Sequence, residues 1–483
     1  MDGRRLTQLL EDVDLAGGAV PDVPVEGVAY RSDRVDPGDG FFCIPGFRFD
    51  GHDFAADAVS RGAAALVCAR PLAIDAPQAV VRDVRRALAL ASARFYGEPT
   101  KELAVVGITG TNGKTTTTYL LESILRAAGR RPGLIGTVET RIAGERLPSK
   151  HTTPESADLQ RLFRTMADAD VDSVAMEVSS HAIDLHRVDG TRFAVAAFTN
   201  LTQDHLDYHH TLEEYWSVKR RLFTELDVET RVVNLDDPRG PELARETEAQ
   251  ATVGRDPAAM VRAVRERREG LATTFDLVTP EGTAAVRLPL TGAYNVSNAL
   301  VAAASARALG VSLDAIVVGL ATAPQVPGRL ERIEEGQAFG VFVDYAHTPD
   351  SLAKAIEAVR AVTPGRVITV FGCGGDRDPE KRPLMGAAAA VGSDEVVLTS
   401  DNPRSEDPVG ILLQIEDGVR ASGTSYVLEV DRRAGIARAL ALAAPGDSVL
   451  IAGKGHEDYQ IFADRTIHFD DREVAREELR SLC

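Results

Sequence analysis

Residues 103–129 constrain the fold of this chain more than any other stretch. They begin with an apolar run, continue through a loop that reads Gly-Thr-Asn-Gly-Lys-Thr-Thr, and end in a segment with apolar residues at helical spacing. The apolar run is typical of a parallel strand covered on both faces, and Gly129 marks the end of the helix. A strand, a glycine-rich loop and a helix in this order predict a phosphate-binding loop, because the free amides at a helix N-terminus attract anions.

The residues of this loop have complementary chemistry. Glycines allow the backbone amides to approach phosphate oxygens, Lys114 reaches the terminal phosphates, and the Thr115 hydroxyl is suited to a magnesium ion. The glycines fall at positions 107, 110 and 113, so the loop is a relative of the standard phosphate-binding pattern and not a copy of it. We predict that a nucleoside triphosphate is bound by the following residues: Gly110, Thr111, Asn112, Gly113, Lys114, Thr115 and Thr116.

The length and the order of apolar segments predict an α/β protein with three domains. A chain of 483 residues exceeds one ordinary core, and about 150 residues per domain is typical. Short apolar strands alternate with helical segments, and residues 261–290 interrupt this order with alternating strands of antiparallel type. We expect domains at residues 1–100, 101–330 and 331–483, the central one with a mostly parallel sheet.

Composition excludes several classes of partner. The net charge of −18 comes from 54 basic and 72 acidic residues, which argues against binding to nucleic acid or to an anionic membrane. No stretch approaches the roughly 18 apolar residues that a membrane-spanning helix needs. The cysteines, at positions 43, 68, 373 and 483, have neither disulfide nor metal-ligand spacing. We therefore expect a reducing, cytoplasmic location.

A carboxylate and a group of histidines follow two further predicted strands. Glu177 stands at the carboxyl end of a buried strand, the edge where open α/β sheets bind ligands, and is expected to share a magnesium ion with Thr115. Five of the ten histidines lie between positions 181 and 210. A zinc site lacks its usual ligand spacing here, so a second magnesium site that uses His205 fits a triphosphate enzyme better. Spacing alone leaves open which histidine is functional.

Two other features complete the pattern. Lys219 lies in an amphipathic helix over residues 215–223, where the pattern by itself predicts a solvated basic face. In the third domain, polar loops follow four predicted strands, at residues 344–351, 372–377, 400–404 and 453–457. Because the carboxyl ends of parallel strands share one edge of a sheet, these loops together predict a binding face.

Motifs along most of the chain resemble those of the Mur ligases, the ATP-dependent amide ligases that build the stem peptide of peptidoglycan. Besides the phosphate loop, they are His-Thr-Thr-Pro-Glu-Ser at 151–156, Met-Glu-Val-Ser-Ser-His at 176–181, Thr-Asn-Leu-Thr-Gln-Asp-His-Leu-Asp-Tyr-His at 199–209, Gly-Ala-Tyr-Asn-Val-Ser-Asn at 292–298 and Pro-Gly-Arg-Leu-Glu at 327–331. The resemblance is greatest to the members that add diaminopimelate. It implies an N-terminal UDP-binding domain, a central ATPase domain and a C-terminal Rossmann-like domain that closes over the site.

The resemblance also implies a reaction. ATP would activate UDP-MurNAc-L-Ala-D-Glu as an acyl phosphate with release of ADP, and meso-diaminopimelate would then be added, as a step of peptidoglycan precursor synthesis. The implied partners are small molecules, with no nucleic acid and no membrane insertion, and we expect a monomer. The likeness further implies Mg2+ and a carbamate that carbon dioxide forms on the neutral amine of Lys219. The implied metal ligands are Thr115, Glu177, His205 and Lys219, and the implied catalytic residues are Lys114, Glu177, His205 and Lys219.

The family likeness assigns the remaining positions as three groups of contacts. The implied adenosine contacts are Asn295, Arg329 and Asp344. The implied contacts of the UDP-linked dipeptide are Ser32, His151, Thr152, Thr153, Ser179 and Arg187. The implied amino-acid pocket consists of Arg377, Asp401, Asn402, Pro403, Arg404, Gly453 and Glu457.

The chain departs from the family pattern in two places. The family often has Gln where this chain has Leu185, which predicts the loss of one polar substrate contact. It commonly has Asp-Ser-Arg where this chain has Ser32-Asp33-Arg34, which leaves open which hydroxyl binds the uridine.

Arg404 bears on which amino acid is added. An arginine forms a planar bidentate pair with a carboxylate, and meso-diaminopimelate has a second carboxylate that lysine lacks. Three alternatives stay open: the same reaction with L-lysine, a folylpolyglutamate synthetase-like ligase, and a nucleotide-dependent switch without ligase turnover. The presence of Lys114, Glu177, His205 and Lys219 argues against the switch.

Overall fold

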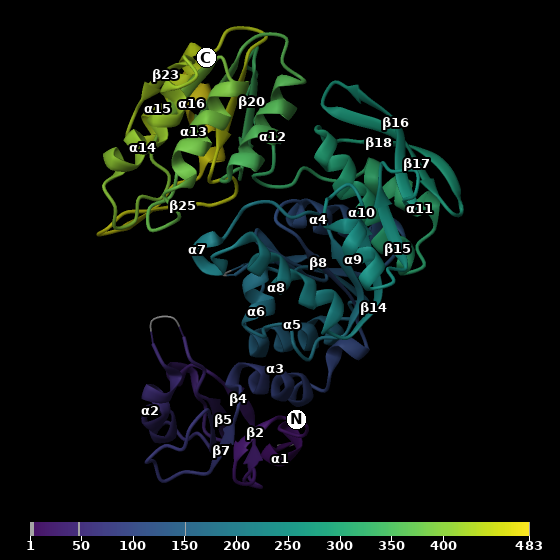
Figure 1. The fold of residues 1–483 in the computed structure, drawn as a ribbon, viewed down its shortest axis with the longest axis vertical. Helices are drawn as coiled ribbons and strands as arrows, with labels where there is room; N and C mark the ends of the chain where they lie inside the picture. Colours follow the sequence, from purple (N-terminus) through teal and green to yellow (C-terminus); the bar gives the residue numbers. More distant parts are fainter. Residues whose placement is uncertain (1–3, 47–48, 150, 483) are drawn as a thin grey trace.

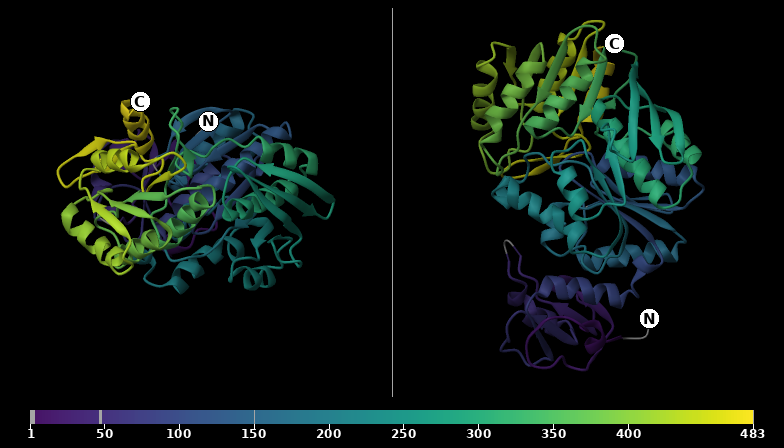
Figure 2. Two further views of the ribbon diagram at one scale, coloured as in Figure 1. Left: turned by 90° about the horizontal axis from the view of Figure 1, so that it is seen from above. Right: turned by 45° about the vertical axis from the view of Figure 1, so that its right-hand side comes forward.

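The protein is arranged as three α/β units stacked along its long axis (Figure 1). The computed structural model describes residues 4–46, 49–149 and 151–482, so Cys483 lies outside the described residues. Each unit has a sheet with helices packed against it. The right-hand view of Figure 2 shows the same stacking of the three units. The predicted α/β class with three domains is confirmed.

The N-terminal unit is built on a small sheet with the strand order β2-β7-β6-β5-β4, in which only β2 is antiparallel. One apolar cluster, which includes Leu6, Phe42 and Leu88, packs on one face, and a second, which includes Phe41 and Ala58, packs on the other. Its elements are β1 Arg4–Arg5, α1 Leu6–Leu9, β2 Leu15–Gly17, β3 Pro24–Val25, β4 Gly27–Ala29, the 3-10 turn Ser32–Arg34, β5 Asp39–Phe42, the 3-10 turn Gly51–Phe54, α2 Ala55–Ser60, β6 Ala65–Cys68, β7 Gln78–Val81, α3 Val84–Phe95 and the 3-10 turn Pro99–Lys101.

The central unit contains an 11-stranded sheet with the order β11-β10-β9-β12-β8-β13-β14-β15-β16-β17-β18. Strands β9 to β16 of this order run parallel, and antiparallel strands extend both edges. Its elements are β8 Ala104–Thr109, α4 Lys114–Ala127, β9 Pro132–Ile135, β10 Glu139–Ile142, β11 Glu145–Pro148, α5 Ser156–Asp168, β12 Ser173–Glu177, α6 Ser180–Asp184, β13 Phe193–Phe198, α7 Leu206–His209, α8 Leu212–Thr224, β14 Val228–Asn234, α9 Gly240–Glu246, β15 Ala251–Gly254, β16 Val261–Glu269, β17 Ala272–Thr279, β18 Gly282–Leu288, α10 Ala293–Ala308 and α11 Leu313–Ala321.

Helix α10 covers part of one face of the central sheet. Its sequence is rich in alanine on all sides, so it is buried against α4 and against strands β13 to β16 instead of presenting a polar face to water. The opposite face of the sheet is covered by α5, α6 and α8 around residues such as Phe163 and Trp216. The antiparallel strands predicted over residues 261–290 are confirmed as β16, β17 and β18, whereas the hairpin β10–β11 was not predicted.

The C-terminal unit has a six-stranded sheet with the order β19-β20-β24-β21-β22-β23, parallel except for β19. The four strands predicted to precede the polar loops are present as β20, β21, β22 and β24. Its elements are β19 Glu331–Arg332, β20 Gly340–Asp344, α12 Pro349–Arg360, β21 Val367–Phe371, α13 Lys381–Gly392, β22 Glu395–Leu398, α14 Pro408–Arg420, β23 Ser425–Leu428, α15 Arg432–Leu442, β24 Ser448–Ala452, β25 Tyr459–Ile461, β26 Thr466–His468 and α16 Asp471–Leu482.

The central unit contacts each of the other two units. Asn112 in the loop after β8 donates a hydrogen bond of 3.3 Å to Asp350 at the start of α12, and α3 of the N-terminal unit packs against α5. At the same N-terminal junction, the Tyr30 hydroxyl donates to Asp158 at 2.6 Å. Within the described residues, no helix has the length and apolar character that crossing a bilayer requires.

Candidate active site

The predicted phosphate loop joins β8 to α4, as its sequence pattern requires. The Lys114 amine folds back over the loop and donates to the carbonyl oxygens of Gly110 and Thr111, both at 2.8 Å. Gly113 has a φ of 87°, and a Cβ atom at this position would overlap with the side-chain oxygen of Asn298. The loop therefore needs glycine at position 113 both for its backbone conformation and for space.

The loop that follows β13 forms hydrogen bonds with the phosphate loop. The Thr199 hydroxyl donates to the carbonyl oxygen of Asn112 at 2.7 Å, and the amides of Thr111 and Asn112 donate to the backbone and side-chain oxygens of Asn200 at 2.8 and 3.0 Å. These bonds hold the loop in one shape while the N-terminus of α4 stays directed at the space where phosphate groups would bind.

Glu177 lies at the end of β12, directly beside the phosphate loop. Its carboxylate accepts hydrogen bonds from the Thr115 hydroxyl at 3.1 Å, from the Thr137 amide at 2.8 Å and from the Thr137 hydroxyl at 3.0 Å. The residue is 1% exposed. Glu177 and Thr115 are thus brought into contact as predicted, and together they present hard oxygen atoms of the kind that magnesium prefers.

Lys219 is not on a solvated basic face, so the prediction from the helical pattern alone is wrong. The residue is 1% exposed, because α8 turns Lys219 toward the sheet together with Tyr215, one helical turn earlier. Its amine donates to the carbonyl oxygen of Gly110 at 3.0 Å and lies 4.4 Å from the centre of the Tyr215 ring. Burial holds the pKa of Lys219 well below its ordinary value, and the positive charge of Lys114 lowers this pKa further.

His205 precedes α7 and has a positive φ of 54°. The centre of its ring lies 5.0 Å from that of the His181 ring and 6.1 Å from that of the Tyr215 ring. Its Nε2 atom lies 3.5 Å from a carboxylate oxygen of Asp204. Desolvation lowers the pKa of His205 to about 4. Among the described residues, no hydrogen bond or ion pair joins His205 to Glu177 or Lys219, and no three His, Cys, Asp or Glu side chains are grouped as a metal site.

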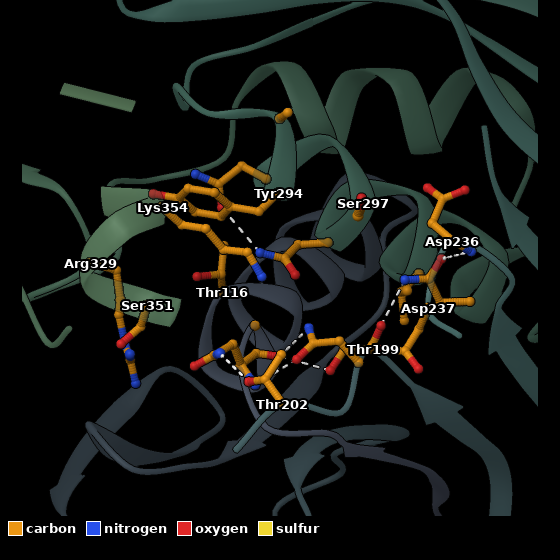
Figure 3. Close-up of a pocket in the computed structure, with 18 of the residues that line it drawn as sticks. Thr116, Thr199, Thr202, Asp236, Asp237, Tyr294, Ser297, Arg329, Ser351 and Lys354 are labelled. Carbon is orange, nitrogen blue, oxygen red and sulfur yellow. Dashed lines mark hydrogen bonds between the residues drawn. The ribbon is translucent and has the colours of Figure 1, made fainter. Parts of the chain in front are cut away.

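A cavity of about 490 Å³ opens beside the phosphate loop, between the central and C-terminal units (Figure 3). The predicted adenosine contacts Asn295, Arg329 and Asp344 all line it. Figure 3 shows Arg329, Ser351 and Lys354 on one side of this nucleotide cavity and two acidic side chains, Asp236 and Asp237, on the other. Its size and its position next to Gly113 suit a nucleoside attached to the bound phosphates.

Two charged residues of this cavity are positioned by the segment that links the units. Arg329 donates through Nη2 to the Thr115 hydroxyl at 3.0 Å, and its guanidinium carbon lies 4.7 Å from the centre of the Tyr345 ring. Asp344 accepts hydrogen bonds from the amides of Leu330 at 2.6 Å and Ala346 at 2.8 Å. Burial raises the pKa of Asp344 to about 6.

A second cavity, of about 310 Å³, is formed by the polar loops at the carboxyl edge of the C-terminal sheet. It is lined by every residue of the predicted amino-acid pocket except Pro403, namely Arg377, Asp401, Asn402, Arg404, Gly453 and Glu457. His205 of the central unit lines the same cavity. We refer to it as the amino-acid cavity. All four polar loops contribute residues to this cavity, as expected from their placement after parallel strands.

Buried polar side chains organise the floor of the amino-acid cavity. Asn402 donates to Glu457 at 3.0 Å, and the fully buried amine of Lys454 donates to Asn402 at 3.1 Å and to Glu457 at 3.2 Å. Arg404, with a positive φ of 54°, donates through Nη1 to the carbonyl oxygen of Gly375 at 2.7 Å. Within the described residues, this is the only hydrogen bond of its guanidinium, so the other donors remain for a ligand.

Four residues of the predicted dipeptide-binding group surround Glu177. The Thr152 hydroxyl lies 3.0 Å from that of Thr137, the Thr153 hydroxyl donates to the Glu177 carbonyl oxygen at 2.8 Å, and the Ser179 amide donates to Thr153 at 3.2 Å. Arg187 donates to the Thr153 carbonyl oxygen at 3.1 Å.

The other two members of that group are placed differently. His151 is exposed and directly precedes Thr152 in the sequence. Ser32 lies in a 3-10 turn of the N-terminal unit and lines neither cavity. Leu185, which stands where the family often has Gln, follows α6 directly.

Family models match most of the chain. The model described as Mur ligase family, catalytic domain, matches residues 24–96, the Mur ligase middle domain matches residues 108–306, and the Mur ligase, glutamate ligase domain, matches residues 328–455. The chain belongs to the Mur ligase family.

Individual relatives agree with this assignment. The chain is 50% identical to the UDP-N-acetylmuramoyl-L-alanyl-D-glutamate–2,6-diaminopimelate ligase of Geobacillus kaustophilus (strain HTA426), with 95% of each protein covered. It is 47% identical to the ligase of the same name from Bacillus licheniformis, with 99% of each covered. A solved structure of a ligase with this name matches with a TM-score of 0.70 and 32% identity, covering 99% of each chain.

Three residues that contact the predicted site residues were not themselves predicted. Asn298, which donates to Asn295 at 3.1 Å, is the second asparagine of a motif that was recognised, so its position carried a signal. Lys454 lies inside the recognised loop at 453–457. Thr137 had no such signal, because its contact with Glu177 depends on the unpredicted turn before β10.

Proposed function

We propose that this Mur ligase adds meso-diaminopimelate to UDP-MurNAc-L-Ala-D-Glu in an ATP-dependent, ADP-forming reaction of peptidoglycan precursor synthesis. The amino-acid cavity carries the proposal, because it presents Arg404, Arg377 and Glu457 beside His205 of the central unit. The relatives that are 47% and 50% identical to it along nearly the whole chain are named for this reaction.

The first step uses the phosphate loop and the cluster around Glu177. The D-glutamyl carboxylate of the dipeptide attacks the γ-phosphorus of ATP, which gives an acyl phosphate and ADP. Lys114 and the N-terminus of α4 neutralise the charge that builds up on the transferred phosphoryl group. Arg187, Thr152, Thr153 and Ser179 orient the dipeptide at this point, since they surround Glu177.

The second step takes place between the two cavities. The amine of diaminopimelate attacks the activated carbonyl carbon, an amide bond forms, and inorganic phosphate leaves. Asp204 and His205 of the central unit line the amino-acid cavity, and the Thr111 hydroxyl of the phosphate loop donates to the carbonyl oxygen of Thr202 in the same segment at 3.1 Å. An amine held at this side of the cavity is therefore directed toward the phosphate loop. Arg404 binds the distal carboxylate of diaminopimelate, a group that lysine lacks.

The residues present fit magnesium. The Thr115 hydroxyl and the Glu177 carboxylate already touch, and both are oxygen ligands. We propose that His205 and a carbamate on Lys219 complete the site, because a buried, uncharged amine is the form of lysine that captures carbon dioxide. When bound, the ion supplies positive charge for the phosphates.

We also propose that the protein acts as a cytoplasmic monomer. We place the domain boundaries near residues 100 and 330, where the 3-10 turn Pro99–Lys101 and the segment between α11 and β19 connect the units. The N-terminal domain, residues 1–100, would bind the UDP part of the substrate, with Ser32 as a uridine contact.

A coupled assay tests the function. We expect ADP release only when ATP, UDP-MurNAc-L-Ala-D-Glu and meso-diaminopimelate are all present, together with a product whose mass equals that of the tripeptide precursor. AMP as the nucleotide product would contradict the acyl-phosphate scheme. ADP release without an amide product would instead indicate a nucleotide-dependent switch.

A further inference from the structure

Arg432 is a buried cation outside the cavities and has no role in the reaction steps above. It is the first residue of α15, and its side chain is fully buried. Its Nε and Nη2 donate to the two carboxylate oxygens of Asp471 at 2.8 and 2.7 Å, which is the bidentate geometry of a strong arginine–carboxylate pair. Asp471, at the start of α16, is also fully buried.

The remaining hydrogen bonds of Arg432 reach the base of the amino-acid cavity. Nη1 donates to the carbonyl oxygen of Ser400 at 3.1 Å, and Nη2 donates to that of Ala452 at 3.0 Å. Ser400 directly precedes Asp401, and Ala452 directly precedes Gly453, so both acceptors stand next to residues that line the cavity.

The two loops that Arg432 joins do not share a ladder of backbone hydrogen bonds. They follow β22 and β24, which are separated in the sheet by β21. A Cβ atom on Gly453 would lie 2.7 Å from the Asp401 carboxylate, so the loops nevertheless touch at the cavity. The Asn402–Glu457 and Lys454–Asn402 hydrogen bonds join the loops at the cavity floor, and Arg432 joins the two strand ends. Arg432 therefore helps to determine how far apart these loops lie.

The electrostatic surroundings keep this bridge charged. Desolvation opposes the charge of Arg432, but Asp471 overcomes it and holds the pKa above its ordinary value, with help from Asp401 and Glu457 of the cavity. A buried ion pair adds little net stability compared with apolar residues of the same volume. The arrangement is thus better explained by the geometry it imposes than by the free energy it contributes.

We infer that Arg432 is a positioning residue for diaminopimelate, and that Asp471 fixes its orientation. Together with the bonds at the cavity floor, Arg432 sets the distance between the loop with Asp401, Asn402 and Arg404 and the loop with Gly453 and Glu457. Through this distance it affects the affinity for the incoming amino acid. The inference rests on the proposed function, because it concerns the cavity to which that function assigns diaminopimelate.

The test compares Arg432→Lys with Arg433→Lys. Lysine keeps the charge but cannot form the bidentate pair and both carbonyl bonds, so we expect the KM for meso-diaminopimelate to rise by about tenfold or more. The KM values for ATP and for the UDP-linked dipeptide should stay within about twofold of the wild type, since their sites are formed elsewhere. Arg433 is the matched control, because it is exposed and pairs with Glu477 and Glu478 on the same helix α16.

Two further measurements distinguish a positioning role of Arg432 from a loss of folded structure. They also distinguish it from a failure of the proposed function. Thermal unfolding reports the folded fraction of each variant, and calorimetric titration with meso-diaminopimelate reports binding without turnover. Absence of wild-type turnover would contradict the proposed function. With an active wild type, equal changes in all three KM values, or an unchanged KM for diaminopimelate, would overturn the role of Arg432.

Asp471→Asn provides a second variant of nearly equal volume, to be used if Arg432→Lys does not fold. Its amide can accept only one of the two guanidinium bonds, so the same selective rise in KM is expected, with a smaller magnitude. A folded Asp471→Asn enzyme with the wild-type KM for diaminopimelate would count against the inference.

Discussion

Burial changes the chemistry of Lys219. On a solvated helix face this side chain would be a cation, but in the structure it lies under the phosphate loop with Gly110 and the Tyr215 ring as its neighbours. Because burial and Lys114 hold its pKa far below the ordinary value, the amine is available as a nucleophile for carbon dioxide. The carbamate that we propose would convert this residue into an anion beside the phosphate loop.

We predict that Lys219→Ala reduces the rate of ADP release by about 10² to 10³, because the variant loses a ligand for the ion that neutralises the phosphates. Lys101→Ala, which removes an exposed lysine paired with Glu98, should leave the rate unchanged. Carbon-13 NMR after exposure to labelled bicarbonate should detect a carbamate in the wild type and not in Lys219→Ala. Wild-type turnover in Lys219→Ala would refute the role of this residue.

The raised pKa of Asp344 predicts a pH dependence of stability. The ordinary value is 3.8 and the folded value is about 6, so between these values the folded state holds a proton that the unfolded state has released. The contribution of this group to the free energy of unfolding is therefore fully present below about pH 4 and is lost as the pH rises through about 6.

Asp344→Asn should remove this contribution. Denaturant unfolding of the wild type and the variant between pH 4 and 7 is the measurement, and we expect the difference between their unfolding free energies to change across that interval. A difference that stays constant with pH would show that Asp344 does not titrate in this range.

At the scale of elements, the strand–loop–helix unit around residues 104–127 forms the nucleotide site that we propose. Gly113 and Gly129 stand at the two ends of α4, and both have positive φ values, of 87° and 76°. A Cβ atom at Gly113 would overlap with Asn298, whereas no atom lies within 4 Å of one at Gly129. Alanine substitutions at the two glycines therefore distinguish an effect of crowding in the site from an effect of backbone strain alone.

We predict that Gly113→Ala weakens ATP binding by about tenfold or more, because the loop must shift away from Asn298. Gly129→Ala should cost about 1 kcal/mol of stability from its left-handed backbone and leave ATP binding unchanged. Isothermal titration with a non-hydrolysable ATP analogue measures the first effect, and thermal unfolding the second. Equal ATP affinities in the two variants would contradict the proposed loop.

The elements with strong local patterns could be predicted from the sequence. Buried strands with glycine-rich or polar loops at their ends, such as β8, β12 and β24, follow directly from apolar runs and turn residues. The hairpin β10–β11 was missed, because β11 is exposed along its whole length and so lacks alternating apolar residues. Thr137 was missed with it, since a contact with Glu177 across 40 positions of sequence leaves no local signal.

The site residues also differ in how well the sequence predicts their surroundings. Those within loops of recognisable motifs, including Asn402 and Glu457, come together in the amino-acid cavity as predicted. The burial of Lys219 depends on how α8 packs, and the burial of Lys454 depends on the end of β24, so neither environment follows from the residue's immediate neighbours in sequence. Tertiary packing and not local pattern determines the chemistry of these two amines.

At the scale of the whole molecule, the reaction depends on how the three units meet. The nucleotide cavity takes residues from both the central and the C-terminal units, and so does the amino-acid cavity, through His205. Arg329 connects the two by reaching from the linking segment to Thr115. The proposed ligase therefore brings its three substrates together between units, and the C-terminal unit selects the amino acid.

The most direct test of this account is ADP release with ATP and UDP-MurNAc-L-Ala-D-Glu, compared for meso-diaminopimelate and L-lysine in the wild type and in Arg404→Ala. Arg465→Ala, an exposed change in the turn between β25 and β26, serves as the control. We predict that wild-type kcat/KM is higher for diaminopimelate by about a hundredfold or more, and that Arg404→Ala loses most of this preference. Equal use of lysine by the wild type, or an unchanged preference in Arg404→Ala, would contradict the account.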